Sequence, residues 1–176
     1  KFIFPKKCPS CGSKTIKEFN SITKKNDAVR RCTSEDYECE KISVEKLKHF
    51  VSKEAFNIDG LGKKIVENFY KLKLINFPQD IFKLDFKKIE TLEGWGKQSV
   101  ENLKYSINQK TNISLERLIY SLGIRHIGLE NAKILSKYFT SFSKFISFSN
   151  KESLNDILNI DGIGETQLKS VKNFFD

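Results

Sequence analysis

Four cysteines have the spacing of metal ligands, and all four lie in the amino-terminal quarter of the sequence. Cys8 and Cys11 share the tight turn CPSCG, while Cys32 and Cys39 form a second, wider pair. Zn²⁺ takes four thiolates tetrahedrally, so the two pairs would fill its coordination sphere and leave no position for a substrate. We therefore predict a structural zinc site in a small ribbon module, residues 1–42, whose folding depends on the metal.

The alternatives to zinc are a redox or disulfide role and free thiols. A redox CxxC pair belongs beside a βαβ pattern, and none is visible in this sequence. A disulfide framework is typical of small secreted domains, whereas the start KFIFPKKCP lacks the apolar stretch of a secretory signal. The sequence therefore favours reduced cysteines in a cytoplasmic protein, with zinc bound to them.

Beyond the cysteines, one short glycine pattern recurs four times. Each copy runs from an aliphatic residue to a final glycine: Ile58–Gly62, Leu92–Gly96, Ile124–Gly128 and Ile160–Gly164. Apolar residues follow four and seven positions after each final glycine, which is the spacing of one helix face. Helical patterns also precede each copy, with Pro78 and a capping box of Ser149 and Glu152 as helix-start signals. The predicted fold is mainly α: a small four-cysteine zinc-ribbon module, then an all-helical domain of four helix-hairpin-helix repeats over residues 43–176.

The glycine turns have the chemistry of phosphate binding. Glycine tolerates positive φ and, because it has no Cβ, lets the backbone approach a ligand closely. A helix that starts at the final glycine presents free N–H groups and the positive end of its dipole, which together favour an anion. We predict contacts with DNA at Gly60, Gly62, Lys63, Lys64, Gly94, Gly96, Lys97, Gln98, Arg125, His126, Gly128, Gly162 and Gly164.

Several side chains near the turns have two interpretations. The apolar residue before each final glycine should plug the space between two helices, although Trp95 could instead stack on a base. His126 replaces a glycine, and it could meet phosphate beside Arg125 or be an ordinary surface histidine. Glu165 stands where a lysine would suit phosphate, and it could instead pair with the helix dipole. We expect His49 to be packed or capping rather than catalytic.

The net charge of +9, from 31 basic and 22 acidic residues, favours an anionic partner, although it could serve solubility alone. Only four basic residues are arginine, which reads guanine edges, and the other 27 are lysine, a point charge suited to phosphate. That balance favours backbone contact without sequence readout, although an AT-rich genome would also enrich lysine. No apolar run of roughly eighteen residues is present, so no membrane partner is expected. The sequence contains no Met, which suggests a piece of a longer protein.

Taken together, the motifs resemble the carboxy-terminal half of bacterial NAD-dependent DNA ligase. The stretches that carry the resemblance cover nearly the whole chain: CPSCG, RRCTSEDYEC, LKHFVSKEAFNIDGLGKKIVENF, TLEGWGKQSVENL, YSLGIRHIGLENAKILSKYF and NIDGIGETQLKSVKNFF. The cysteine spacings are longer than is usual in that family. Its Cys-Pro-Ala after the last cysteine is here Cys39-Glu40-Lys41, so the shape of the zinc loop should differ.

In that family the enzyme moves adenylate from NAD to a lysine and then to a 5′-phosphate, and the 3′-hydroxyl seals the nick. No lysine stands in the adenylation motif K-x-D-G here, and the nearest match, Asn57–Gly60, belongs to a hairpin. The resemblance implies adenylation and OB-fold domains before Lys1 and a BRCT domain after Asp176, with NAD and Mg²⁺ bound outside this chain. We therefore expect the chain alone to hold DNA but not to ligate it.

The resemblance further implies a monomeric clamp along the minor groove of nicked duplex DNA, in the nucleoid-associated cytoplasm of a bacterium. The zinc module would link that clamp to the OB fold. Two other functions stay open: a hairpin module of another repair or recombination protein, and a helical scaffold that binds protein. Steep salt dependence of binding would separate either DNA-binding function from the protein scaffold.

Overall fold

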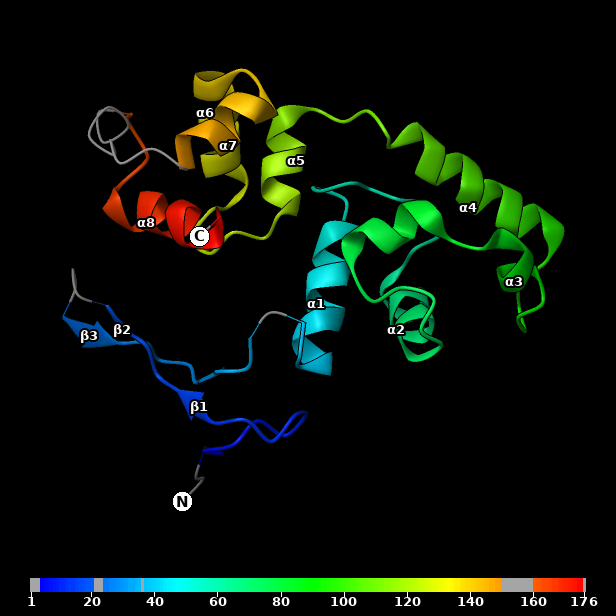
Figure 1. Cartoon of the computed structure of the whole chain (residues 1–176), viewed down its shortest axis with the longest axis horizontal. Coiled ribbons are helices and arrows are strands. Elements are labelled where there is room, and N and C mark those ends of the chain that lie inside the picture. Colours follow the sequence, from blue (N-terminus) through cyan, green and yellow to red (C-terminus); the bar gives the residue numbers. More distant parts are fainter. Residues whose placement is uncertain (1–3, 21–23, 36, 150–159, 176) are drawn as a thin grey trace.

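The structure, a computed structural model, describes residues 4–20, 24–35, 37–149 and 160–175. Four short strands come first: β1 (Thr15–Ile16), β2 (Phe19–Asn20), β3 (Lys25–Asn26) and β4 (Arg31–Cys32). The helices follow: α1 (Glu40–Phe50), α2 (Lys63–Lys71), the 3-10 helix η1 (Pro78–Lys83), α3 (Phe86–Glu90), α4 (Lys97–Gln109), α5 (Leu115–Ser121), α6 (Leu129–Phe139), α7 (Phe142–Ser149) and α8 (Glu165–Phe175). This order confirms the predicted fold class, a small stranded module before a helical domain (Figure 1).

The amino-terminal module, meaning the described residues from 4 to 39, contains two antiparallel ribbons. β1 pairs with β4, with Thr15 opposite Cys32, and β2 pairs with β3, with Phe19 opposite Asn26. Among its described residues only Thr15 and Cys39 are buried. Apolar burial is therefore too small to hold this module together, which agrees with the expectation that a metal stabilises it.

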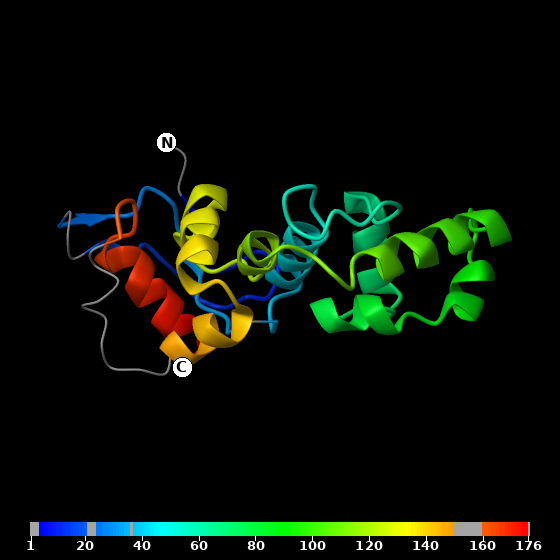
Figure 2. The same ribbon diagram turned by 90° about the horizontal axis from the view of Figure 1, so that it is seen from above.

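The helical part has two apolar cores rather than one. The first is formed by α1, α2, η1, α3 and α4 around residues such as Leu47, Phe69 and Leu103. The second is formed by α5 to α8 around residues such as Leu135 and Phe145. Figure 2 shows α2 to α4 at one end of the molecule and α6 to α8 at the other, with α1 and α5 between them. Each core thus contains two of the four hairpins.

Side-chain contacts with backbone carbonyls join the two cores. Nε2 of His49 on α1 lies 2.7 Å from the carbonyl oxygen of Tyr120 on α5, so this nitrogen carries the proton and donates. Arg117 on α5 donates to the carbonyls of Ala55 (3.2 Å) and Lys53. His49 is therefore packed and hydrogen-bonded, as the sequence predicted, and α1 and α5 are held side by side.

Short-range signals set the start of η1. Pro78 opens η1, as predicted, and the Asp80 carboxylate accepts hydrogen bonds from the amides of Asn76 and Phe77, each at 2.8 Å. The capping box expected from Ser149 and Glu152 lies outside the described residues. Within the described part of the chain, no helix combines the length and the apolar character that crossing a membrane requires.

Candidate nucleic-acid interface and metal site

One backbone turn is built four times. In each hairpin the apolar residue before the final glycine donates its N–H to the carbonyl of the first aliphatic residue. The bonds are Leu61 to Ile58 (3.3 Å), Trp95 to Leu92 (3.1 Å), Ile127 to Ile124 (3.1 Å) and Ile163 to Ile160 (3.0 Å). The third turn residue has positive φ every time: 90° at Gly60, 81° at Gly94, 62° at His126 and 86° at Gly162. The repeat predicted from sequence is therefore a repeat of geometry.

His126 adopts the backbone conformation that glycine has in the other three turns. A non-glycine residue with positive φ is uncommon, although histidine is among the side chains enriched there. Left-handed backbone costs an L-residue roughly 1–2 kcal/mol, so the turn tolerates His126 at some expense of stability. Its imidazole is exposed beside Arg125. This placement leaves both interpretations of His126 open.

Each final glycine stands at the start of a helix. Gly62, Gly96 and Gly128 are the N-caps of α2, α4 and α6, and Gly164 directly precedes α8. Their carbonyls accept the amide of the residue four positions on, for example Val66 to Gly62 at 3.0 Å. All hairpin glycines are exposed: Gly60, Gly62, Gly94, Gly96, Gly128, Gly162 and Gly164. The first-turn amides of these helices consequently face outward, as a phosphate cradle needs.

The final glycines of the first two hairpins are not required by the chain itself. Gly62 and Gly96 have φ of −66° and −121°, which any residue can adopt. A Cβ built on either would meet no heavy atom within 4 Å. Neither conformation nor internal packing explains glycine there, whereas close approach of an external ligand does.

The hairpins pack in pairs. Gly60 of the first hairpin lies against α4, where an added Cβ would stand 3.4 Å from Leu103. Gly162 of the fourth lies against α6, where a Cβ would stand 2.8 Å from Ile134. The Asn131 amide ties the third hairpin to the fourth, because its Nδ2 donates to the Gly162 carbonyl at 3.1 Å. Sequence reasoning missed this link, since the repeat pattern does not say which hairpins pair.

The third and fourth helix starts are capped by side chains. The Gly128 amide donates to Oδ1 of Asn131 at 3.3 Å, and the Gly164 amide donates to Oε1 of Gln167 at 3.2 Å. The equivalent residue of the first hairpin is Ile65, whose side chain has no acceptor. At the third and fourth hairpins a phosphate would therefore compete with a side chain for the glycine amide. At the first hairpin the equivalent residue offers no such competitor.

The predicted polar contacts lie where a phosphate could reach them, and acidic residues lie close to the first two hairpins. Lys63, Lys64, Lys97 and Gln98 are exposed in the first turns of α2 and α4. Asp59 and Glu93, each just before a positive-φ glycine, line a cleft together with Gly60, Gly94 and Trp95. Carboxylates in the cleft disfavour phosphate inside it, so a phosphate would approach Gly60 and Gly94 favourably only from the lysine side of each helix start.

The plug residues behave as expected. Leu61, Ile127 and Ile163 are buried, and Trp95 is half-buried against the first core. The Trp95 ring centroid lies 5.4 Å from that of Phe69, in a tilted arrangement. This contact supports Trp95 as a packing residue rather than a base-stacking one.

The four cysteine sulfur atoms gather at one point. All lie within 4.8 Å of one another, with Cys8 and Cys39 at 3.9 Å and Cys11 and Cys32 at 3.4 Å. Zinc–sulfur bonds of about 2.3 Å in a tetrahedron place sulfur atoms about 3.8 Å apart, close to these separations. The distances exceed the S–S bond of about 2.05 Å, and all four cysteines are free. The cluster can thus hold a metal ion.

Local hydrogen bonds shape this cluster. Gly12, at φ 76°, donates its amide to the Cys8 carbonyl at 2.9 Å and closes the first turn. Hydrogen bonds from Ser13 lower the pKa of Cys11 to about 6. The Ser34 amide lowers the pKa of Cys32, but desolvation and the neighbouring thiols raise it to about 12. Because thiolates this close repel one another, the cysteines do not all lose their protons in the absence of a metal. A bound dication offsets this repulsion and favours the thiolate forms.

Comparisons with known proteins agree with this geometry. The helix-hairpin-helix motif family matches residues 117–176, which contain the third and fourth hairpins. A DNA ligase of Pelagibacter ubique (strain HTCC1062) is 65% identical over 99% of this chain. DNA ligases of Rickettsia canadensis (strain McKiel) and Parvibaculum lavamentivorans are 43% and 40% identical, each over 99% of the chain.

The resemblance to DNA ligase is confirmed. The chain spans 26% of the length of each of these three relatives, so the match covers about a quarter of each of them. The matched part includes the cysteine cluster and all four hairpins. A hairpin module without the cysteine cluster, the second function left open by the sequence, would match over the helical part alone.

One predicted contact is already engaged within the chain. The guanidinium of Arg125 pairs with the carboxylates of Glu18 and Asp27, which belong to the amino-terminal module. Sequence reasoning had no signal for this pairing, because the partners are about a hundred residues apart.

Proposed function

We propose that this chain is the DNA-gripping part of an NAD-dependent DNA ligase, and that it binds duplex DNA along the minor groove without reading sequence. One observation carries the proposal: four copies of one exposed turn each end at a helix start, and two final glycines have no internal reason to be glycine. Amides and a helix dipole at each start suit one phosphate. Two pairs of hairpins would contact the phosphates of both strands beside a nick.

The residues divide by role. The hairpin glycines keep the helix starts open, the lysines add charge, and Gln98 and His126 offer side-chain hydrogen bonds. The proposed contacts are Gly60, Gly62, Lys63, Lys64, Gly94, Gly96, Lys97, Gln98, His126, Gly128, Gly162 and Gly164. Arg125 is left out of this set because two carboxylates hold its guanidinium. Lysine-dominated contact with phosphate carries little sequence information, which suits an enzyme that must act at any nick.

We further propose that the four cysteines hold one structural Zn²⁺. Cys39 is both a ligand and the N-cap of α1, so the metal would join the ribbons directly to the first helix. The distances and the choice of four thiolates fit zinc, and with four protein ligands no coordination position stays open for catalysis.

The rest of the enzyme completes the proposal. Adenylation with NAD and Mg²⁺, and the OB-fold and BRCT domains, belong to parts of the parent protein outside this chain. The chain alone would then seal no nick, and it would act as a monomer within its parent on nicked DNA in the bacterial cytoplasm. The lack of a K-x-D-G lysine motif in this sequence supports that division of labour.

The test is a salt titration of binding to nicked duplex DNA. Each phosphate contact should add about −0.9 to the slope of log K against log salt, so several contacts give a steep slope. Scrambling the duplex sequence should leave the affinity within about twofold, since base edges contribute little. DNA affinity that does not change with salt concentration, or no DNA binding at low salt, would contradict the proposal and favour a scaffold that binds protein.

A further inference from the structure

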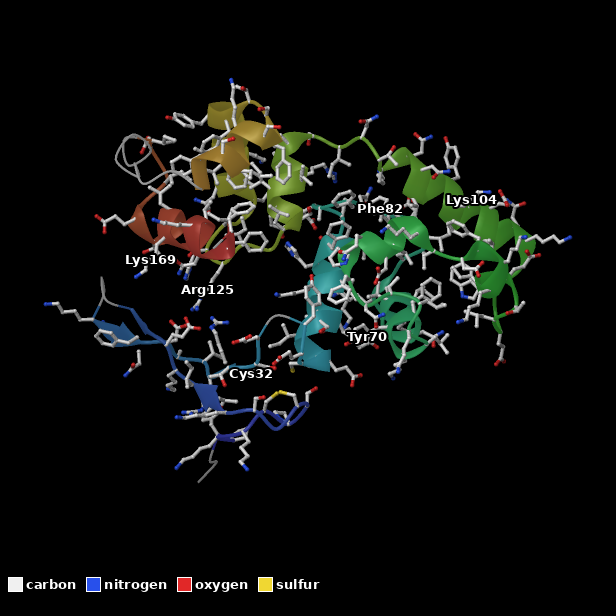
Figure 3. All side chains as sticks on the ribbon, viewed as in Figure 1. Cys32, Tyr70, Phe82, Lys104, Arg125 and Lys169 are labelled. Atoms are coloured by element: carbon white, nitrogen blue, oxygen red, sulfur yellow. The ribbon has the colours of Figure 1, made fainter. Side chains whose placement is uncertain are left out.

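Arg125 projects out of the third hairpin toward the strands of the amino-terminal module (Figure 3). Its Nη1 pairs with Oε2 of Glu18, and its Nη2 lies 3.1 Å from Oδ2 of Asp27. The guanidinium offers donors in a planar fork, so two carboxylates can be held at once. Arg125 therefore bridges two separate parts of the fold.

A backbone hydrogen bond also holds the two acidic residues next to each other. The Asp27 amide donates to the Glu18 carbonyl at 2.7 Å, and these residues flank the hairpin of β2 and β3. Arg31 adds a second cation to the same group, with its Nε 3.5 Å from Oδ2 of Asp27. The carboxylates that accept from Arg125 therefore belong to two residues whose relative position is already fixed at the end of the β2–β3 ribbon.

The charges around Arg125 do not suit an incoming phosphate. Glu18, Asp27 and Glu165 line the same cleft as Arg125, and the described cations there are Lys46 and Lys169 together with Arg125 itself. The three carboxylates that line the cleft match its three lining cations, and the nearby Arg31 is already paired with Asp27, so little net charge is left to attract an anion. A phosphodiester would also have to displace two carboxylates that already satisfy the guanidinium.

The module has a second attachment at its other end. Cys39 is buried and forms the N-cap of α1, so the chain itself anchors that end to the first helical core. The Tyr37 ring lies edge-on to Phe77, with centroids 5.0 Å apart, which strengthens the same anchor. Without a contact at the ribbon, the module could rotate about this point. The ribbon contact reaches the second core, where Arg125 lies.

We propose that Arg125 is a positioning residue, which sets the orientation of the metal-binding module against the third hairpin, rather than a phosphate contact. Two attachment points, one on each helical core, determine how the module sits relative to the hairpin surface. The orientation part of the proposal concerns the free protein. Only its DNA arm rests on the proposed function, so the two can fail separately.

The first arm measures orientation in the zinc-loaded protein without DNA. Arg125→Ala should raise amide exchange at Asp27 by about two- to fivefold, the size expected for partly exposed ion pairs. The radius of gyration from X-ray scattering should also rise as the module becomes free to rotate. Reversing all four charges together (Arg125→Glu and Arg31→Glu with Glu18→Lys and Asp27→Lys) should restore both values, because Asp27 also pairs with Arg31. Lys169→Ala is the matched control, because it removes a cation from the same cleft and should change neither.

The second arm measures the salt dependence of DNA binding. Arg125→Ala should leave the slope of log K against log salt unchanged. The double substitution Glu18→Gln with Asp27→Asn should shift the affinity for DNA in the same direction as Arg125→Ala, because both remove the same ion pairs. If Arg125 contacted a phosphate, Arg125→Ala would instead make the slope less steep by about 0.9. That loss of slope, or unchanged exchange and scattering in the first arm, would overturn the assignment.

Discussion

At the scale of single residues, the structure shows which side chains serve the turns and which serve the fold. Asn131 caps the third hairpin through Oδ1 and binds the fourth through Nδ2. Trp95 packs on Phe69, and His49 joins two helices. These roles depend on neighbours distant in sequence, so residue type alone leaves them open.

His126 allows a direct test at this scale. Replacing it with glycine relieves the left-handed strain but adds freedom to the unfolded chain, so His126→Gly should raise the free energy of unfolding by about 0.5–1 kcal/mol. The β-branched substitution His126→Val should lower it by at least about 1 kcal/mol. Urea denaturation measures both. A destabilised His126→Gly protein would show that the imidazole makes contacts worth more than the strain.

At the scale of elements, the helix-hairpin-helix unit joins stability to binding at the same atoms. The apolar plug holds two helices together, and at the first hairpin the turn beside it leaves the next helix start without a side-chain cap. A better N-cap would stabilise the helix but occupy the amides that a phosphate needs, so folding and binding favour different residues at this position.

That conflict can be measured at Gly62. Asparagine is a good N-cap and meets no steric obstacle there, so Gly62→Asn should leave stability unchanged or raise it by a few tenths of a kcal/mol. It should weaken DNA binding about tenfold, the loss of roughly one charge-assisted hydrogen bond. The matched control is Ser114→Asn at the N-cap of α5, which belongs to no hairpin turn and should not change affinity. Equal effects of the two substitutions on binding would contradict the cradle.

At the scale of the whole molecule, three bodies follow one another along the chain: the metal-binding module and two helical cores. The cores bury their own apolar residues, whereas the module buries almost none in its described part. Loss of the metal should therefore destabilise the module and leave the two helical cores folded.

Chelation tests this difference. Removing the metal should abolish the dispersed amide signals of both ribbons and fray the first turn of α1, because Cys39 is its N-cap. Helices α2 to α8 should keep a cooperative thermal transition, since their cores need no ligand. Circular dichroism with amide spectra follows both parts. The loaded protein should contain about one equivalent of zinc, and a chelated protein with intact ribbons would argue against the site.

The sequence by itself determined the repeat, the four cysteines and the helix starts. These follow from local rules: glycine where φ is positive, apolar residues at helical spacing, and cysteines in tight turns. The resemblance over nearly the whole chain also indicates DNA ligase from the sequence alone.

Only the tertiary structure decided how these parts associate. It paired the hairpins first with second and third with fourth, split the helical part into two cores, and paired Arg125 with Glu18 and Asp27. The physical reason is that such contacts join residues far apart in sequence, and their geometry depends on the packing of every helix between them. A charged residue in a glycine turn has the same local pattern whether its partner is a phosphate or a distant carboxylate.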